Sequence, residues 1–186
     1  VLNRDFKATV PCEKWLTDVT EFKYYVGSEV KKLYLSAILD LYDRRIIAYK
    51  IGDSNNNALV FETFDEATAL YPNAKPIFHS DRGFQYTNKV FHQKLVDAGM
   101  IQSMSRVGRC LDNAPMEGWW GIIKSEMYYL KKFTNREALV SAIEDLHTLL
   151  QHPPLPEASE LHDTVRILPF HRRVTKNLPL LRSRGR

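Results

Sequence analysis

Three acidic residues stand where a carboxylate is unusual. Asp18 lies inside the apolar segment 15–22, Asp81 ends the short apolar segment 76–81, and Glu117 falls in the first turn of an amphipathic stretch. Burying a carboxylate in such segments is unfavourable unless it is paired or bound to a metal. Carboxylate oxygens are the ligands that hard cations such as Mg²⁺ prefer. Together, the three acids are candidates for one metal-dependent active site.

Taken singly, each acid also has a structural explanation. Asp81 could cap a turn, Glu117 could favour a helix N-terminus, and Asp18 could pair with Lys14 or Lys23. Three other acids have structural assignments. Asp40 is assigned to a strand end, Asp43 to a turn, and Asp112 to a helix cap, with Asn113 as the alternative cap.

The elements that must position the three acids follow from the spacing of apolar residues. Period-two and short apolar runs predict strands over 15–22, over 31–52 with a hairpin turn at 41–45, over 76–81 and over 101–106. Helical spacing predicts helices over 57–70, 88–99 and 114–130, and a last helix from Thr134 with Glu137 as its capping-box partner. This order predicts an α/β fold, a mixed sheet flanked by helices.

The helix predicted over 114–130 carries Glu117 and one apolar stripe. The stripe consists of Met116, Trp119, Trp120, Ile123, Met127 and Leu130. Stacking of the tryptophans on bases is an alternative, but their spacing favours core packing. Two glycines interrupt the helix, Gly118 and Gly121, and each costs about 1 kcal/mol relative to alanine.

The spacing of the acids makes the sequence recognisable. Thirty-five residues lie between Asp81 and Glu117, and Lys124 follows Glu117 by seven positions, on the same helical face. The blocks WLTDVTEF, HSDRGFQYT and DNAPMEGWWGIIKSE resemble the signature blocks of insertion-sequence transposases of the integrase-core superfamily. The resemblance covers about Val1 to Asp145. It implies a ribonuclease-H-like fold with a five-stranded mixed sheet.

The resemblance also implies a chemistry and its residues. Asp18, Asp81 and Glu117 would be the catalytic and metal-binding acids, and Lys124 their DNA-binding basic partner. Two Mg²⁺ or Mn²⁺ ions would support attack of water on one phosphodiester and then of the freed 3′-hydroxyl on another. The implied partners are DNA and further copies of the chain. The alternatives are an inactive transposase remnant that only binds DNA or a partner transposase, and a nuclease of the ribonuclease H type.

Weaker expectations concern neighbouring residues. Gly83 is expected to permit a tight turn beside Asp81. His79 shares a strand face with Asp81, so it could touch the metal's surroundings, although a packed histidine is favoured. Gly118 stands where the family usually has serine. The family's upstream helical DNA-binding region is not part of this sequence, so these residues alone are not expected to recognise the element's ends.

The charge is distributed unevenly. The formal net charge is +4, yet residues 1–163 hold 19 basic against 22 acidic residues, so the excess lies in the last stretch. Any DNA contact by the folded part must therefore use local patches. No membrane-spanning run or secretory signal is evident, which predicts a cytoplasmic protein. Cys12 and Cys110 form no metal-binding or disulfide pattern.

The organisation predicted is a lead-in over 1–10, a catalytic core over 11–145, and a basic, disordered tail over 146–186. The family's Tyr-Asn-x-x-Arg and Thr-Pro-x-Glu-Tyr blocks are absent from that tail. Codons that encode this stretch can be chosen so that reading them one base later gives both blocks in order. They appear as Tyr-Asn-Thr-Pro-Arg and then Thr-Pro-Tyr-Glu-Tyr. The sequence therefore predicts that the chain leaves its proper reading frame near Leu146 and that transposition is impaired.

Overall fold

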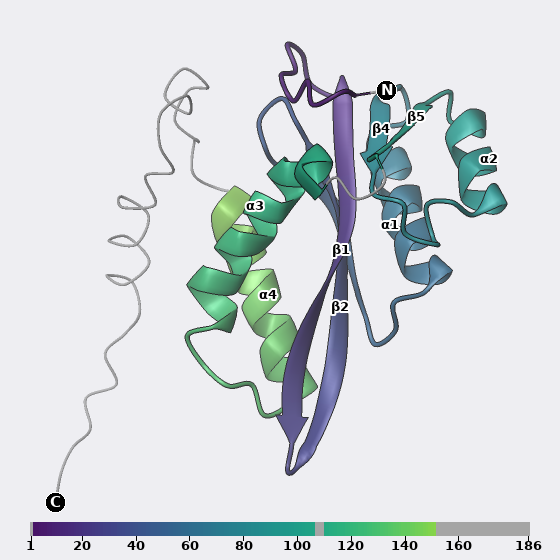
Figure 1. Cartoon of the computed structure of the whole chain (residues 1–186). Helices are drawn as coiled ribbons and strands as arrows, with labels where there is room; N and C mark the ends of the chain where they lie inside the picture. The colour runs from purple at the N-terminus through teal and green to yellow at the C-terminus, as the bar shows by residue number, and fades with distance from the viewer. Residues whose placement is uncertain (1, 107–109, 152–186) are drawn as a thin grey trace, which may run out of the picture. The chain divides into compact units, whose positions relative to one another are not determined.

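The computed structural model describes residues 2–106 and 110–151 (Figure 1). A five-stranded sheet has the strand order β3-β2-β1-β4-β5. The strands are β1 (Lys14–Val26), β2 (Glu29–Asp40), β3 (Ile46–Gly52), β4 (Ile77–Ser80) and β5 (Ile101–Met104). β1, β2 and β3 pair antiparallel, whereas β4 pairs parallel with both β1 and β5. The predicted mixed sheet is confirmed.

Helices cover both faces of this sheet. They are α1 (Asn57–Leu70), α2 (Lys89–Asp97), α3 (Ala114–Ile123) and α4 (Arg136–Gln151). A 3₁₀ turn over Cys110–Asn113 precedes α3, and a π-helical segment over Lys124–Tyr128 follows it. α1 and α2 lie on one face, and α3 and α4 lie on the other (Figure 1). The side chains of Asn56 and Asn88 cap α1 and α2, as such residues favour.

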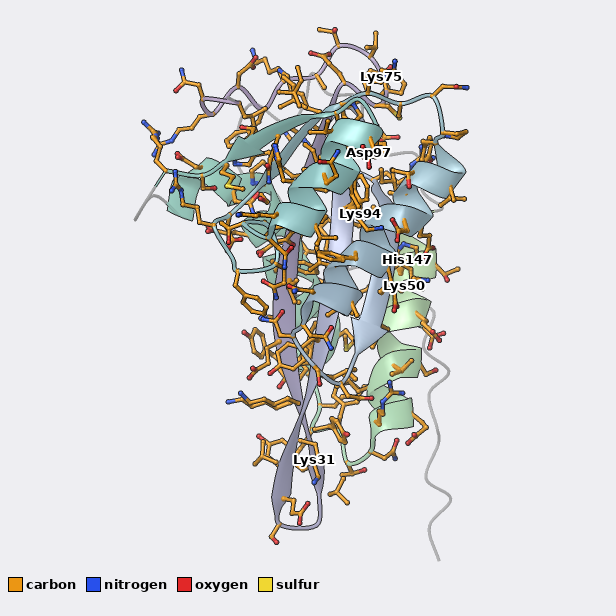
Figure 2. All side chains as sticks on the ribbon, turned by 90° about the vertical axis from the view of Figure 1, so that its right-hand side faces the viewer. Lys31, Lys50, Lys75, Lys94, Asp97 and His147 are labelled. Carbon is orange, nitrogen blue, oxygen red and sulfur yellow. The ribbon has the colours of Figure 1, made fainter. Side chains whose placement is uncertain are left out.

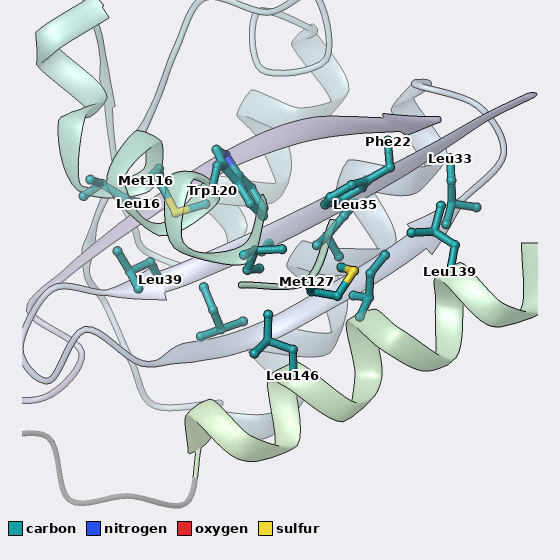
Figure 3. Close-up of a cluster of buried hydrophobic side chains, with 14 of the residues drawn as sticks. Leu16, Phe22, Leu33, Leu35, Leu39, Met116, Trp120, Met127, Leu139 and Leu146 are labelled. Carbon is teal, nitrogen blue, oxygen red and sulfur yellow. The ribbon is translucent and has the colours of Figure 1, made fainter. Parts of the chain in front are cut away.

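Alternation along β1 divides the core between the two faces. Trp15 points toward α1 and α2, where it joins a cluster with Phe64, Phe78 and Phe91. Leu16 belongs to the cluster under α3 and α4 (Figure 3). That second cluster also holds Phe22, Leu33, Leu35, Leu39, Met116, Trp120, Met127, Leu139 and Leu146. Because successive strand residues face opposite sides, Asp18 lies on the α3 side of β1.

The edge of β1 that faces β4 is open over most of its length. β4 pairs only with Lys14–Leu16, so in the described chain the rest of this edge has no strand partner. The connector between α3 and α4 runs beside it instead. The Lys23 N–H donates to the Tyr128 hydroxyl at 2.9 Å, and the Tyr25 N–H donates to the Phe133 carbonyl at 2.9 Å.

Two details of the predicted helices are wrong. The α-helix ends at Ile123, and the Tyr129 N–H bonds the Lys124 carbonyl at 2.8 Å, five residues back. This wider turn takes Leu130 out of the apolar stripe, and the Leu130 side chain is 70% exposed. The last helix is capped by Asn135, whose side chain accepts the Ala138 N–H at 2.7 Å, rather than by a capping box from Thr134.

The folded core extends past its predicted end near Leu146. α4 continues to Gln151, and Leu146 is buried against the sheet because it continues the helix's apolar face. Residues 152–186, which hold most of the predicted tail, lie outside the described residues. Within the part of the chain that is described, no helix is long and apolar enough to cross a membrane.

Candidate active site

Asp18 lies just beyond the point where β1 loses β4 as its neighbour. Its Oδ1 accepts the Val19 N–H at 2.8 Å, and its Oδ2 accepts the indole N–H of Trp120 at 3.0 Å. Burial raises the pKa of Asp18 to about 6, although these two hydrogen bonds lower it. The negative charges of Asp81 and Glu117 raise this pKa further. An acid on β1 is thus electrostatically coupled to two acids far along the chain.

Asp81 follows the last residue of β4. Its Oδ1 accepts the Gly83 N–H at 2.8 Å, so the carboxylate is held by its own turn. A Cβ at Gly83 would lie 3.0 Å from Asp81 Oδ1 and 3.1 Å from Gln85 Oε1. A side chain at this position would therefore crowd the Asp81 carboxylate. The interpretation of Asp81 as a turn cap is compatible with its interpretation as a metal-binding acid, because the turn that it caps also orients its carboxylate.

Glu117 lies in the first turn of α3, and its side chain is exposed. Trp120, one turn later on the same helix, reaches Asp18 across the gap between α3 and β1. Among the described residues, no three His, Cys, Asp or Glu side chains form a set able to hold a metal ion as they stand. The fold thus places Asp81 and Glu117 close enough to raise the pKa of Asp18. The three acids do not form a preformed coordination shell.

Lys124 is half-buried and faces β1 rather than open solvent. Its Nζ lies 5.6 Å from the centroid of the Phe22 ring. Burial lowers the pKa of Lys124, whereas the negative charges of Asp18 and Glu21 raise it. The predicted basic partner therefore sits beside the same strand as Asp18, on the open edge of the sheet.

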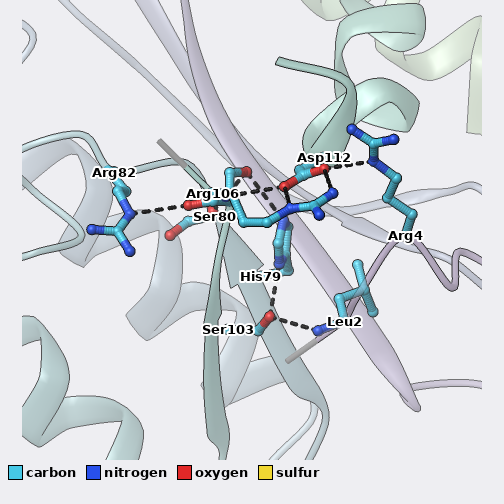
Figure 4. A network of polar contacts seen from close by, with 9 residues as sticks. Leu2, Arg4, His79, Ser80, Arg82, Ser103, Arg106 and Asp112 are labelled. Atoms are coloured by element: carbon cyan, nitrogen blue, oxygen red, sulfur yellow. Dashed lines mark hydrogen bonds and ion pairs between the residues drawn. The ribbon is translucent and has the colours of Figure 1, made fainter. Parts of the chain in front are cut away.

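His79 is a packed histidine, as favoured from its sequence. Its Nδ1 and Nε2 lie 2.9 Å and 3.2 Å from the hydroxyls of Ser103 and Ser105 (Figure 4). The Ser103 hydroxyl also accepts the Leu2 N–H at 2.9 Å, which ties the lead-in segment to β5. Burial lowers the pKa of His79. Both ring nitrogens thus have partners inside the fold.

Of the two residues predicted as alternative caps of α3, Asp112 does not cap the helix. Arg106 pairs with it through Nε and Nη2, both at 2.9 Å, and Arg4 through Nε at 2.6 Å (Figure 4). These cations hold the pKa of Asp112 far below its usual range. Asn113 occupies the cap position without a side-chain capping bond. The cluster holds the backbone at Asp112, five residues before Glu117.

Two features of the site were missed from sequence. Trp120 was assigned to the core; it is buried there, but its N–H also reaches Asp18. The available signal was its position three residues after Glu117, on the same helical face. The pairing of Arg4 with Asp112 spans 108 residues. No local pattern predicts such a contact.

Comparisons with known proteins show which family the chain resembles. Residues 8–110 match the integrase core domain family, a span that includes Asp18 and Asp81 and ends before Glu117. A transposase-like protein of Haemophilus influenzae is 46% identical over 145 residues, which are 78% of this chain and 65% of that protein. A protein of Escherichia coli K12 described as the transposase InsK of element IS150 is 43% identical over 146 residues, 78% of this chain and 50% of that protein.

Among solved structures, the magnesium complex of the HTLV-2 integrase catalytic core domain, in its dimeric form, has a TM-score of 0.59 at 19% identity. The alignment covers 81% of this chain and 94% of that one. The predicted ribonuclease-H-like fold is thereby confirmed. The chain spans about half to two thirds of the length of the curated relatives named above. With more than half of its residues in the family match, the chain belongs to the integrase core domain family.

Proposed function

We propose that this chain is the catalytic core of an insertion-sequence transposase, which cleaves DNA strands and joins the freed ends to new DNA. The relatives described as transposases support this assignment. One observation carries it: Asp18, Asp81 and Glu117 share an electrostatic neighbourhood although ninety-nine positions separate the first from the last. Placing negative charges close together is unfavourable unless a bound metal cation compensates them.

The donor set fits a hard divalent cation. All three side chains offer carboxylate oxygens, and the pKa of Asp18 is raised first by burial and then by the charges of Asp81 and Glu117. Mg²⁺ or Mn²⁺, as two ions, would activate the attacking oxygen and stabilise the leaving one. The related viral core was solved with magnesium. Asp18 and Asp81 are already oriented by hydrogen bonds, so we expect the exposed Glu117 side chain to complete the site.

The chain's own residues would divide the remaining work. Trp120 fixes one oxygen of Asp18, and the Gly83 turn fixes one oxygen of Asp81, so the direction of each carboxylate is set before DNA arrives. Lys124 has no ion pair with a carboxylate among the described residues, and its ammonium group is therefore available to a DNA phosphate beside Asp18. No protein nucleophile is required, because water and then a DNA 3′-hydroxyl attack.

Two DNA ends must be processed together, so we expect the active form to be a multimer on paired ends. Related solved structures include dimeric and trimeric forms of the HTLV-2 core and a simian T-cell lymphotropic virus intasome. A strictly monomeric species that joins two ends in concert would contradict this expectation.

The proposal is tested by cleavage and strand-transfer assays on DNA that carries candidate element ends, with Mg²⁺ or Mn²⁺. We expect Asp18→Asn to abolish both reactions while the far-ultraviolet circular dichroism spectrum stays that of the wild type. Asp97→Asn, which changes an exposed acid on α2, is the matched control and should retain both reactions. Metal-dependent cleavage without any joining would favour a nuclease, and DNA binding without either reaction would favour an inactive remnant.

A further inference from the structure

Positive charge is concentrated at one end of the described chain. Residues 21–32 of the β1–β2 hairpin and residues 124–133 after α3 hold six basic and three acidic residues. The rest of residues 2–106 and 110–151 holds twelve basic and sixteen acidic residues. The basic residues of this end are Lys23, Lys31, Lys32, Lys124, Lys131 and Lys132. A local excess of this kind, on a chain that is otherwise acidic, creates a confined positive potential.

The two segments meet along the open edge of β1. The Lys23 backbone bonds the Tyr128 hydroxyl through both its N–H and its carbonyl, at 2.9 Å and 3.2 Å. Farther toward the tip, the Lys132 Nζ lies 4.1 Å from the centroid of the Tyr25 ring. Lys124 lies over Phe22 in the same way, nearer to Asp18. Phe22 and Tyr25 are three positions apart and face opposite sides of β1, so Lys124 and Lys132 flank this edge of the strand from its two sides, with Lys124 nearer to the candidate active site. We call the group of Lys124, Lys131 and Lys132 along this part of β1 the lysine edge.

Several ammonium groups of the lysine edge remain uncompensated. Within the described residues, Lys124, Lys131 and Lys132 form no ion pair and contact aromatic rings instead. The π-helical turn after Ile123 places Tyr129 and Leu130 outward, with 72% and 70% of their surfaces exposed. Uncompensated lysine side chains near the surface are available to bind DNA phosphates.

The length of the lysine edge gives its reach on DNA. Seven residues separate Asp18 from Tyr25 on β1, which at about 3.3 Å per residue is about 23 Å. Phosphates of one DNA strand advance about 3.4 Å along the duplex axis per base pair. The edge therefore matches the backbone of about seven base pairs.

We propose that the lysine edge binds the phosphate backbone of the duplex that flanks the reacting phosphodiester, over about seven base pairs from Asp18. This inference rests on the proposed function, because it takes Asp18 as the point where the reacting phosphate lies. The hairpin tip and the α3–α4 connector thereby become a DNA-positioning surface, and their contact with phosphates is independent of DNA sequence.

The test compares two double variants of the whole chain with equal charge change. Lys131→Gln with Lys132→Gln removes two of the positive charges of the lysine edge and is called the lysine-edge variant. Lys75→Gln with Lys89→Gln removes the charges of two exposed lysines elsewhere. Lys31 at the hairpin tip and Lys75 lie at opposite ends of the molecule (Figure 2). Binding of a fluorescein-labelled duplex of about 30 base pairs is measured by fluorescence anisotropy across a salt series in EDTA.

We expect the slope of log K against log[salt] to become shallower by about 2 in the lysine-edge variant, since each neutralised phosphate contributes about 0.9. The control variant should keep the wild-type slope, and Lys131→Arg with Lys132→Arg should restore it. Equal slopes for the wild type and the lysine-edge variant, or an equal loss in both glutamine variants, would overturn the proposal. A thermal melt of each variant verifies that it remains folded.

Failure of this proposal and failure of the proposed function give different results. If only the proposed function is wrong, Asp18→Asn retains whatever cleavage the wild type has, while the lysine-edge variant still shows a shallower salt slope than the wild type. If only the lysine edge is wrong, Asp18→Asn abolishes cleavage, while the lysine-edge variant keeps both its salt slope and its KM for DNA.

Discussion

The indole N–H of Trp120 donates a 3.0 Å hydrogen bond to Oδ2 of Asp18, joining α3 to β1 at the candidate active site. The bond links the helix that carries Glu117 to the strand that carries the first acid, so the spacing between these elements is fixed by a polar contact as well as by packing. The bond also lowers the pKa of Asp18, which burial raises, because an N–H donor favours the ionised carboxylate.

Replacing Trp120 by phenylalanine should raise the pKa of Asp18 above its value of about 6. The ring still fills the core, but the donor that favours the charged carboxylate is lost. A hydrogen bond to a charged group contributes about 1.5 to 3 kcal/mol, so we expect an increase of roughly one pH unit. The Asp18 carboxyl carbon is titrated by NMR in metal-free buffer. Trp119→Phe is the control, and an equal change in both variants would show that the indole N–H is not responsible.

The raised pKa of Asp18 should make its contribution to stability depend on pH. Its ordinary value is near 3.8, so between pH 6 and pH 4 the folded chain holds a proton that the unfolded chain releases. Stability from this group therefore increases as pH falls through 6. We expect the free energy of unfolding of the wild type to gain about 2 kcal/mol over that of Asp18→Asn between pH 8 and pH 4. Denaturant titrations in EDTA measure this difference, and a constant difference would contradict the raised pKa.

Adding a methyl group at Gly83 should misdirect Asp81. The new Cβ would lie 3.0 Å from Asp81 Oδ1, so either the carboxylate or the turn must shift. We expect Gly83→Ala to lower DNA cleavage roughly 10-fold to 100-fold, as small misplacements of reacting groups do. Thermal melting should show that the protein is still folded.

Gly121→Ala is the matched control for that substitution. Its Cβ would meet no atom within 4 Å, so the change only favours the helix. We expect the free energy of unfolding to rise by about 1 kcal/mol, with DNA cleavage at the wild-type level. A loss of cleavage here as large as at Gly83 would mean that the effect is general to the glycines and not specific to Asp81.

The predicted change of reading frame is decided by sequencing the encoding DNA. If the hypothesis holds, a one-base shift near the codon of Leu146 restores the Tyr-Asn-x-x-Arg and Thr-Pro-x-Glu-Tyr blocks, and a corrected chain should transpose more efficiently. DNA in which no alternative frame contains these blocks would refute it.

The elements with a regular apolar pattern were predictable from sequence. α1 begins and ends at the predicted residues, and the break at residues 41–45 is the predicted hairpin turn. The π-helical turn was not predictable, because Met116, Trp120, Ile123 and Met127 keep an ordinary helical spacing although the π-helical segment begins at Lys124. Periodicity reports which face of a helix is apolar, not where its hydrogen bonding changes.

The candidate acids were predictable because each breaks a local apolar pattern, whereas their surroundings were not. The hydrogen bond from Trp120 and the ion pairs of Asp112 depend on tertiary contacts that no local spacing encodes. The lysine edge was hidden for the same reason. Its residues come from two segments about a hundred positions apart, and the overall charge of the folded part masks them.

The most direct test of the account is to locate Mn²⁺ by anomalous diffraction in crystals of the wild-type chain. The account predicts manganese bound by Asp18, Asp81 and Glu117 together, with their carboxylates within roughly 10 Å of one another, as a pair of ions about 4 Å apart requires. Manganese bound elsewhere, or a Glu117 carboxylate that stays farther than this from both aspartates, would contradict it.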